Sequence, residues 1–234
     1  MKKIILALIF LSLTSCFTSS SRKKTIFFSG TFLKIEKIVK ITACKPKNPK
    51  HCITRQFGSS ASSFVVGHKG DKTYIMTSAH VCATNYGPLA HLPGFEAHET
   101  FYGITEEMQK HMYQIESIDH GADLCIVSTK RFKAKRFKIG KQNPERGERI
   151  YNIASPIGVF EKNLVPLFEG YYMGQAHNRS VISLPATGGS SGSPILDSTG
   201  RVIGVVSAVT RDFHHIVMSS TLEQIKTIIK SVNK

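Results

Sequence analysis

Short apolar runs separated by turn residues fill most of this chain, and they constrain its fold more than any other feature. Turns are indicated at Lys69-Gly70-Asp71 and at Asp197-Ser198-Thr199-Gly200. Because no helical segments alternate with the runs, the pattern favours an all-β barrel or sandwich over a doubly wound parallel sheet. The predicted strands are Ile35–Thr42, Ser63–His68, Thr73–Ser78, Tyr113–Ile118, Asp123–Ser128, Arg149–Ala154, Leu167–Met173, Ser180–Ser183, Pro194–Asp197, Val202–Thr210 and His215–Met218.

The end of the chain has a different periodicity. Leu222, Ile225, Ile228 and Ile229 recur at helical spacing, and a serine or threonine at 219–221 can cap the first turn. The spacing predicts a closing helix over residues 221–230.

The first residues resemble an export signal. Lys2 and Lys3 precede an apolar run of about ten residues, which is too short to span a bilayer but suits a signal-peptide core. The run ends in Leu13-Thr14-Ser15-Cys16, which resembles the bacterial lipobox. We therefore expect residues 1–16 to be a lipoprotein signal, with lipid on Cys16 anchoring the protein to a membrane surface. The alternative is an ordinary signal peptide with a coincidental cysteine.

Under this interpretation the mature protein lies in a bacterial cell envelope, on the periplasmic or extracytoplasmic face. Residues 17–30 form a flexible tether, and residues 31–234 form the folded domain. Its length suits one large all-β domain or two small ones that share a core.

The chain is strongly basic, with a formal net charge of +15 that falls by two when Lys2 and Lys3 are removed. Basic residues cluster at 45–50 and, interleaved with phenylalanines, at 130–138. We expect no nucleic-acid binding, because no motif for it accompanies these stretches. Attraction to anionic lipid and a solvated loop with its phenylalanines turned inward remain the two alternatives for 130–138.

Four cysteines remain after Cys16, an even number that permits disulfides in an exported chain. Cys44 and Cys52 flank a turn-rich loop, so we expect a bridge that closes this hairpin. Cys82 and Cys125 are either a second pair or buried thiols. No metal site is expected, because the cysteines and the ten histidines form no C-x-x-C or H-x-x-x-H cluster.

Three segments carry the residues of nucleophilic catalysis. His80 follows the hydrophobic run Tyr74–Ser78, Asp123 begins another run, and Gly188-Gly189-Ser190-Ser191-Gly192-Ser193-Pro194 surrounds two hydroxyls with small residues. A serine needs a base and an anion-stabilising pocket before it becomes a nucleophile. The chain places a candidate base, a candidate carboxylate and a glycine–serine turn in that order.

These motifs resemble the trypsin-like (chymotrypsin-fold) serine proteases. Thr77-Ser78-Ala79-His80 is similar to the family's T-A-A-H, Asp123-Leu124 to its D-I/L, and Gly189-Ser190-Ser191-Gly192-Ser193-Pro194 to its G-D-S-G-G-P. Ala154-Ser155-Pro156-Ile157-Gly158 resembles a motif of the bacterial HtrA/Deg-type members, and Thr187–Pro194 resembles the glutamyl-endopeptidase form. The resemblance implies two six-stranded antiparallel β-barrels, with a boundary near residues 130–147, and a C-terminal helix.

The resemblance also implies a role for each residue in a serine endopeptidase. Ser191 is the nucleophile, His80 its general base, and Asp123 the carboxylate that orients the imidazole. The amides of Gly189 and Ser191 form the oxyanion hole. The implied partner is a polypeptide substrate, and the reaction needs no metal or organic cofactor.

Two rivals start from the same residues. Gly188-Gly189-Ser190-Ser191-Gly192 spells the G-x-S-x-G of α/β-hydrolases, with Ser190 as nucleophile, but that fold needs its acid and histidine downstream. The stretch after Ser190 is too short to build the remaining sheet, so we reject this interpretation. The other rival is a catalytically silent protease fold that serves as a binding or scaffolding lipoprotein.

Substrate preference is less constrained. By the resemblance, the primary pocket has its floor near Pro185 and Ala186 and its walls near Val206, Ser207 and Val209. None of these carries the carboxylate that a lysine or arginine preference needs, so we expect a small or medium apolar side chain. The insertion at residues 86–111 is either a surface loop with a short helix over 105–111 or a rim that shapes substrate access.

Overall fold

The protein is described here by a computed structural model, which covers residues 30–45, 48–210 and 213–232. The predicted signal peptide, Cys16 and almost all of the predicted tether lie outside the described residues. Within the described part, no helix combines the length and the apolar character needed to cross a membrane.

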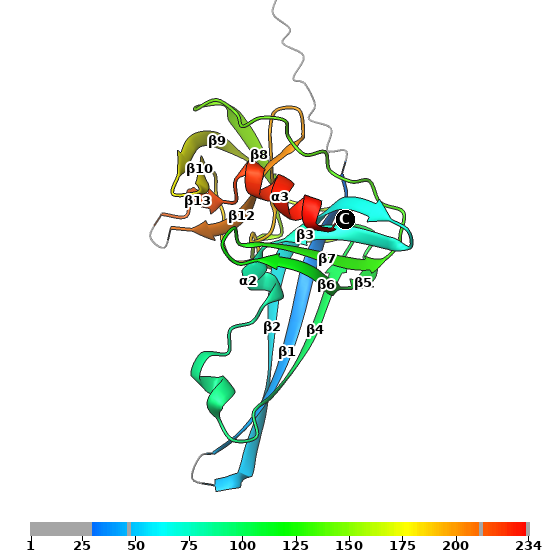
Figure 1. Ribbon diagram of the computed structural model, residues 1–234, viewed down its shortest axis with the longest axis vertical. Coiled ribbons are helices and arrows are strands. Elements are labelled where there is room, and N and C mark those ends of the chain that lie inside the picture. The colour runs from blue at the N-terminus through cyan, green and yellow to red at the C-terminus, as the bar shows by residue number, and fades with distance from the viewer. Residues whose placement is uncertain (1–29, 46–47, 211–212, 233–234) are drawn as a thin grey trace, which may run out of the picture.

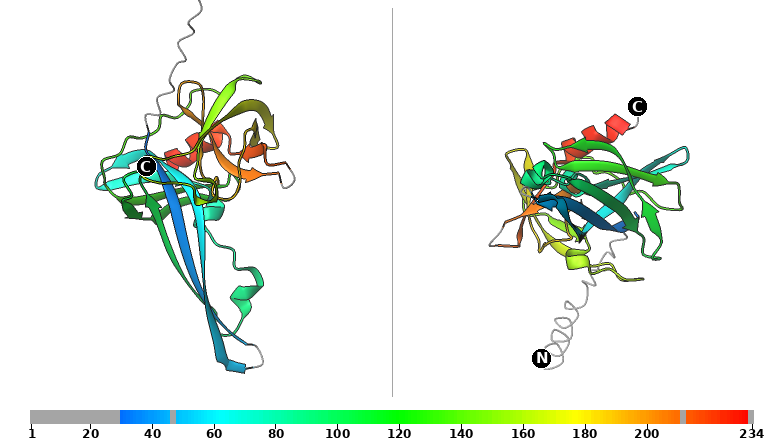
Figure 2. Two further views of the ribbon diagram at one scale, coloured as in Figure 1. Left: turned by 180° about the vertical axis from the view of Figure 1, so that it is seen from behind. Right: turned by 90° about the horizontal axis from the view of Figure 1, so that it is seen from below.

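The strands β1 to β13 pair antiparallel with their neighbours and form two sheets (Figures 1 and 2). The first sheet has seven strands in the order β5-β4-β1-β2-β3-β7-β6, and the second is a closed six-stranded barrel in the order β10-β13-β12-β11-β8-β9. The bounds are β1 Phe32–Lys45, β2 Asn48–Lys69, β3 Lys72–Thr77, β4 Glu96–Ile104, β5 Lys110–Met112, β6 Gln114–Asp119, β7 Leu124–Lys130, β8 Arg149–Ile153, β9 Leu167–Ala176, β10 Arg179–Ser183, β11 Pro194–Leu196, β12 Val202–Val209 and β13 Ile216–Ser219.

The predicted all-β, chymotrypsin-like fold is confirmed, with one difference in the first sheet. The first sheet is open and has seven strands instead of forming a closed six-stranded barrel. The insertion contributes two of these strands, β4 and β5, at one edge. β4 pairs along β1 and β5 pairs with β4. The helix expected over 105–111 is wrong: Thr105 to Gln109 form the turn between β4 and β5, in which the Thr105 carbonyl accepts a hydrogen bond from Met108 N. The short 3₁₀ helix of the insertion, η1, lies earlier, at Gly87–His91.

β1 and β2 are much longer than the sequence indicates, and with β4 they leave the body of the protein as a long ribbon (Figures 1 and 2). Their register continues without a shift from Phe32 opposite Phe64 to Cys44 opposite Cys52. We call the projecting part, residues 38–45, 48–59 and 87–100, the arm. The expected Cys44–Cys52 disulfide is confirmed and joins the two strands near the end of the arm.

The main hydrophobic cluster lies between the two sheets, so it holds them as one unit. Phe64 of β2 packs edge-on against Phe137 of the connecting segment, with ring centroids 5.7 Å apart. Leu196 and Val202 contribute from the barrel. In the basic stretch 130–138, Phe137 is buried and Phe132 is half-buried while the lysines and arginines are exposed, as in the solvated-loop alternative.

The closing helix is confirmed as α3, Leu222–Val232. Ile225 and Ile228 join the cluster between the sheets. Its first turn is closed reciprocally: Gln224 N donates to Thr221 Oγ1 at 3.3 Å, and Thr221 N donates to Gln224 Oε1 at 2.8 Å. This arrangement gives the orphan amides at the helix start side-chain acceptors.

Candidate active site

His80 lies on the one-turn helix α2, Ala79–Cys82, directly after β3. Two buried hydroxyls before it connect this turn to both sheets. Thr77 Oγ1 donates to the Ser62 carbonyl of β2, and Ser78 Oγ donates to the Val206 carbonyl of β12, each at 2.8 Å. The small polar residues before His80 therefore fix the histidine at the junction of the two halves.

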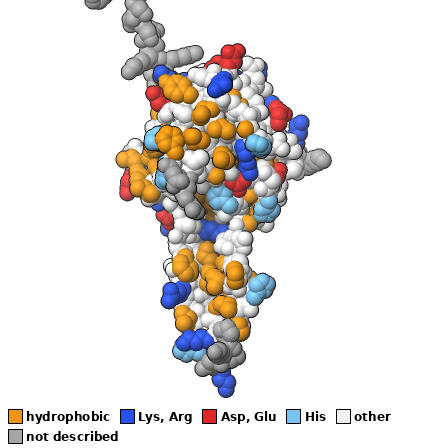
Figure 3. Space-filling view, turned by 90° about the vertical axis from the view of Figure 1, so that its left-hand side faces the viewer, with side chains coloured by type: hydrophobic (Ala, Val, Ile, Leu, Met, Phe, Trp, Pro, Cys, Tyr) orange, Lys and Arg blue, Asp and Glu red, His pale blue; other side chains and the backbone are white. Residues whose placement is uncertain are grey.

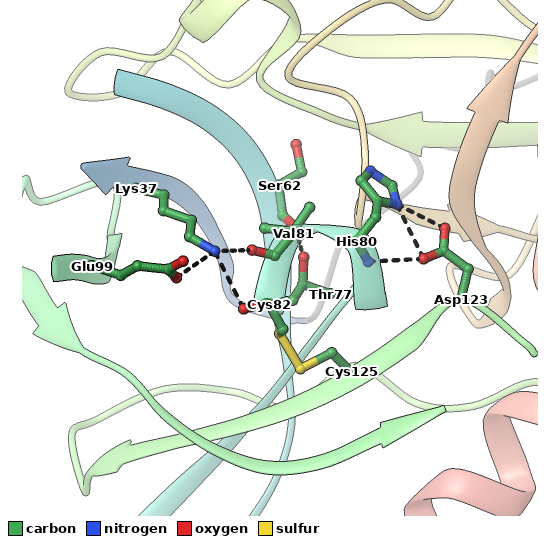
Figure 4. Close-up of a disulfide and its surroundings, with 9 residues drawn as sticks. All are labelled: Lys37, Ser62, Thr77, His80, Val81, Cys82, Glu99, Asp123 and Cys125. Atoms are coloured by element: carbon green, nitrogen blue, oxygen red, sulfur yellow. Dashed lines mark hydrogen bonds and ion pairs between the residues drawn. A yellow bond between two sulfur atoms is a disulfide. The ribbon is translucent and has the colours of Figure 1, made fainter. Parts of the chain in front are cut away.

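Asp123 holds His80 through its ring and its backbone (Figure 4). His80 Nδ1 lies 2.9 Å from Asp123 Oδ2 and 3.1 Å from Oδ1, and the His80 amide donates to Oδ1 at 3.0 Å. Asp123 itself has a φ of +54°, the left-handed conformation that aspartate tolerates better than most residues. The structure thus brings together two of the predicted catalytic side chains.

Hydrogen bonds keep the Asp123 carboxyl ionised although it is partly buried. Burial raises its pKa, but hydrogen bonds from the His80 ring, the Ser207 hydroxyl and the His80 amide lower it, and the net pKa lies below the ordinary value. Ser207 donates to Oδ2, the same oxygen that accepts from the ring. A carboxylate held in this way keeps one imidazole tautomer and favours the protonated ring.

A disulfide connects the two segments that carry this pair (Figure 4). Cys82 lies two residues after His80, and Cys125 lies two residues after Asp123. Of the two alternatives that the sequence left open, the structure has the bridge, and both cysteines are buried in the hydrophobic cluster of the first sheet. The bridge therefore joins covalently the segment that follows His80 to the segment that follows Asp123.

On its other side, α2 rests on a buried lysine that the sequence did not single out. Lys37 Nζ lies 2.7 Å from Glu99 Oε2 and donates to the carbonyls of Val81 at 3.1 Å and Cys82 at 3.3 Å (Figure 4). Only 6% of the lysine side chain is exposed. Tyr86 also donates to Glu99. The insertion thus supplies the counter-ion of a cation that holds the end of the His80 helix.

The turn that bears Ser191 is fastened by the opposite sheet. Ser62 N donates to the Ser191 carbonyl and Ser62 Oγ to the Gly189 carbonyl, each at 2.8 Å. Ser191 is half-buried, whereas Ser190 is only 1% exposed and its Oγ accepts from Thr187 N. Ser191 lines a cavity that His80 also lines.

Gly189 adopts a φ of +94°, and a Cβ there would overlap the Ser155 carbonyl oxygen. The HtrA-like segment that contains Ser155 therefore packs directly behind the predicted oxyanion hole. Within the described residues, the amides of Gly189 and Ser191 donate to no protein acceptor. Two amides without a partner at a turn are what an oxyanion hole requires.

Two cavities meet at His80. One, of about 480 Å³, is lined by His80, Ser191, Gly189 and the inner part of β1, and the other, of about 710 Å³, by His80, Asp123, Arg179 and Ser207. Sequence reasoning missed Arg179, whose guanidinium donates to Ala122 O at 2.7 Å and Gly121 O at 3.1 Å and so braces the turn before Asp123. Nothing in its local sequence distinguishes it from a surface arginine.

The residues expected around the primary pocket fall into two groups. Ser207 lines the larger cavity, while Ala186 and Val206 are buried in the core of the second barrel and Val209 packs against it. Pro185 is half-buried beside them. No group of three or more histidine, cysteine or acidic side chains within the described ranges is arranged to hold a metal ion.

Several solved structures have a similar fold. An HtrA-type protease, AlgW, with a decapeptide superposes with a TM-score of 0.65 at 15% identity, covering 85% of this chain and 63% of that one. AlgW with a tripeptide gives 0.58 at 15% identity, with 83% and 59% covered. The active form of the Rv3671c protease from M. tuberculosis gives 0.57 at 16% identity, with 82% and 78% covered.

The chain thus spans less than two thirds of the AlgW structures, and at these identities the likeness concerns the fold alone. No curated protein matches the sequence. Residues 61–205 match the family model of the trypsin-like peptidase domain, which is more than half of the chain and includes all three motifs. The protein therefore belongs to the trypsin-like peptidase domain family.

Proposed function

We propose that the protein is a serine endopeptidase that hydrolyses peptide bonds through His80, Asp123 and Ser191. The observation that carries this proposal is the direction of the imidazole. Asp123 occupies Nδ1 on one side of the ring, which leaves Nε2 for the cavity that His80 shares with Ser191. A base in that place is what a serine nucleophile requires.

In the proposed reaction, Ser191 Oγ attacks the carbonyl carbon of the scissile bond while His80 Nε2 takes its proton. The resulting oxyanion receives hydrogen bonds from the Gly189 and Ser191 amides, a term of about 3–4 kcal/mol for each donor in comparable sites. His80 then gives the proton to the leaving amine, and an acyl-enzyme on Ser191 remains. Water, deprotonated by His80, hydrolyses this ester and restores the serine.

The neighbouring serines provide a matched test. The full chain and its Ser191→Ala and Ser190→Ala variants are incubated with an unstructured protein substrate, and degradation is followed by gel. We expect loss of degradation in Ser191→Ala and its retention in Ser190→Ala. Equal degradation by all three proteins would refute the assignment, and no degradation by the unaltered chain would favour a silent scaffold.

For the primary pocket we propose a preference for small or medium apolar side chains. The resemblance places Ala186, Val206 and Val209 around this pocket, and none of the three carries a charge. A peptide library varied at the residue before the scissile bond tests this expectation. A preference for lysine, arginine or glutamate would contradict it.

We further propose that the protein is exported to a bacterial cell envelope and tethered by lipid on Cys16. The basic start, the apolar run and the lipobox-like Leu13–Cys16 support this. Metabolic labelling with a fatty-acid probe should mark the unaltered protein and not Cys16→Ala. Labelling that persists in the variant would place the lipid elsewhere or reject it.

A further inference from the structure

One face of the arm is apolar and exposed. Val39 lies opposite Phe57, and Ala43 lies opposite Ile53, so these four side chains point to the same side of the ribbon. Phe57 is 52% exposed and Ile53 is 46% exposed. Figure 3 shows hydrophobic side chains gathered along the arm on the face turned to the viewer. Exposed apolar side chains gathered in this way mark a binding surface.

This face is hollow, because the η1 segment stands beside it as a second wall. Leu89 and Leu92 of that segment enclose with Ile41, Ile53 and Phe57 a groove of about 410 Å³. A concave groove fits an extended chain, whereas a flat bilayer would contact only its rim. The shape therefore favours a polypeptide occupant over a lipid surface.

The groove continues the candidate catalytic cavity. Val39 lines the cavity that contains His80 and Ser191, and Ile41, the next residue on the same face of β1, lines the groove. Two residues along a strand span about 7 Å, so the two hollows adjoin. A chain bound at Ser191 in an extended form can follow β1 directly onto the arm.

The direction of that chain follows from the other cavity. Ser207 and Ala208, next to the expected primary pocket, line the cavity on the far side, together with Asp123. The acyl part of the substrate lies there in the proposed reaction. The arm therefore receives the leaving-group side, downstream of the scissile bond.

The far end of the groove is basic. Lys45 lines this end and Lys50 follows on the adjoining part of β2, while Arg55 lines the groove opposite Ile41, between Phe57 and Ile53; all three are exposed. Cations at this position complement carboxylates on the occupant.

We propose that the arm groove binds the substrate polypeptide downstream of the scissile bond, through apolar side chains followed by acidic residues. This inference rests on the proposed endopeptidase function for its direction. At about 3.3 Å per residue, the path from the catalytic cavity to the basic end needs a downstream segment of about ten residues.

The test combines a double variant with a matched control. Ile53→Ser/Phe57→Ser removes the exposed apolar surface of the groove. Met112→Ser/Ile115→Ser removes similarly exposed apolar side chains from β5 and β6, the two edge strands of the sheet, outside the arm. Thermal unfolding of each variant checks its fold. The substrates are a short quenched peptide and the same peptide with a downstream tail of about ten residues. The tail has leucine at every second position and ends in glutamates.

We expect the groove variant to lose at least about tenfold in kcat/KM on the tailed peptide, and less than about twofold on the short one. The control variant should resemble the unaltered protein on both. In a Ser191→Ala background, fluorescence anisotropy with the labelled tail alone should show the same loss of affinity in the groove variant. This binding assay tests the groove even when no peptide is cleaved.

Equal affinity of the tail for the groove variant and the control would overturn the proposal, as would cleavage of both peptides at the same rate by the unaltered protein. Vesicles of anionic phospholipid form a separate arm. Vesicle binding that depends on Ile53 and Phe57, with no tail binding, would assign the face to lipid instead. Tail binding without any cleavage would keep the groove and reject the proposed function.

Discussion

A variant in which Cys82 and Cys125 are both alanine tests whether the bridge beside the candidate His–Asp pair stabilises the fold and the site. The bridge joins residues 43 apart in sequence, whereas Cys44 and Cys52 are 8 apart. Removing a bridge returns loop entropy to the unfolded chain, and this entropy increases with the logarithm of the loop length.

The loop lengths give the two magnitudes. Loop closure is worth about 4 kcal/mol for the 43-residue separation and about 2.5 kcal/mol for the 8-residue separation. The alanine variant also loses two buried sulfur atoms from the core of the first sheet, whereas in the arm Cys44 is buried but Cys52 is exposed, so the packing cost there is smaller. The difference between the variants should therefore be at least about 1.5 kcal/mol.

Urea unfolding followed by fluorescence gives both free energies, with the Cys44→Ala/Cys52→Ala variant as the matched control. Reducing the remaining bridge of that control with a thiol separates loop entropy from lost packing, because no atoms are removed. For catalysis we expect a fall in kcat/KM of at least about tenfold in Cys82→Ala/Cys125→Ala, since small misplacements of catalytic groups are costly. The Cys44→Ala/Cys52→Ala variant should cleave a short peptide as fast as the unaltered protein.

The reasoning would be refuted if the two double variants lost the same free energy of unfolding. Unchanged activity of Cys82→Ala/Cys125→Ala would show that the hydrogen bonds between His80 and Asp123 hold the pair without the bridge.

Three further changes probe the surroundings of the site. Lys37→Met should cost about 2 kcal/mol at pH 7, because it leaves the partly buried Glu99 carboxylate without its cation. Burial raises the Glu99 pKa but Lys37 lowers it below 4.5, so this contribution is present above that pH and disappears as the pH falls through the folded pKa; urea unfolding at pH 7 and pH 3 checks the loss. Ser207→Ala should raise the pKa of Asp123, observed by carbon NMR of the carboxyl, and lower kcat/KM about tenfold; an unchanged pKa would contradict the hydrogen bond that Ser207 donates to Asp123. Gly189→Ala should lower kcat about a hundredfold with little change in KM, measured by steady-state kinetics. At φ +94° a Cβ would displace the turn that carries the proposed oxyanion-hole amides. A normal kcat would exclude that turn from catalysis.

The sequence was sufficient to predict the fold class, and the His80 and Asp123 motifs that it singled out lie next to each other in the structure. His80 ends one recognisable motif and Asp123 begins another, and the strand pattern placed His80 after one buried run and Asp123 before the next. The closing helix was also predictable from the sequence, because its apolar residues, including Ile225 and Ile228, recur at helical spacing and lie on one face. These features depend on local pattern, which a single chain displays directly.

The strand over 35–42 and the hairpin closed by Cys44 and Cys52 were predicted, but the length of the arm was not, because the outer residues of β2 lack the alternation of a strand that rests on a core. Residues 50–59 are exposed on both faces and include Gly58 and adjacent serines, so only pairing with β1 makes them a strand. Lys37 was missed for a related reason. A lysine in an apolar run is expected to reach solvent, and here it is buried by Glu99, which arrives from a distant segment.

The length of β2 has a consequence for solubility. Within the described strands, residues 50–60 of β2 pair with β1 on one side and have no strand on the other. An edge of this length exposes a row of backbone donors and acceptors that another chain can extend, which is a route to aggregation. Lys50 and Arg55 are charged and exposed along it, and Gly58 weakens its pairing. We expect that replacing Lys50 and Arg55 with valine would promote edge-to-edge aggregation of the protein through the arm, because these charges oppose pairing with another chain.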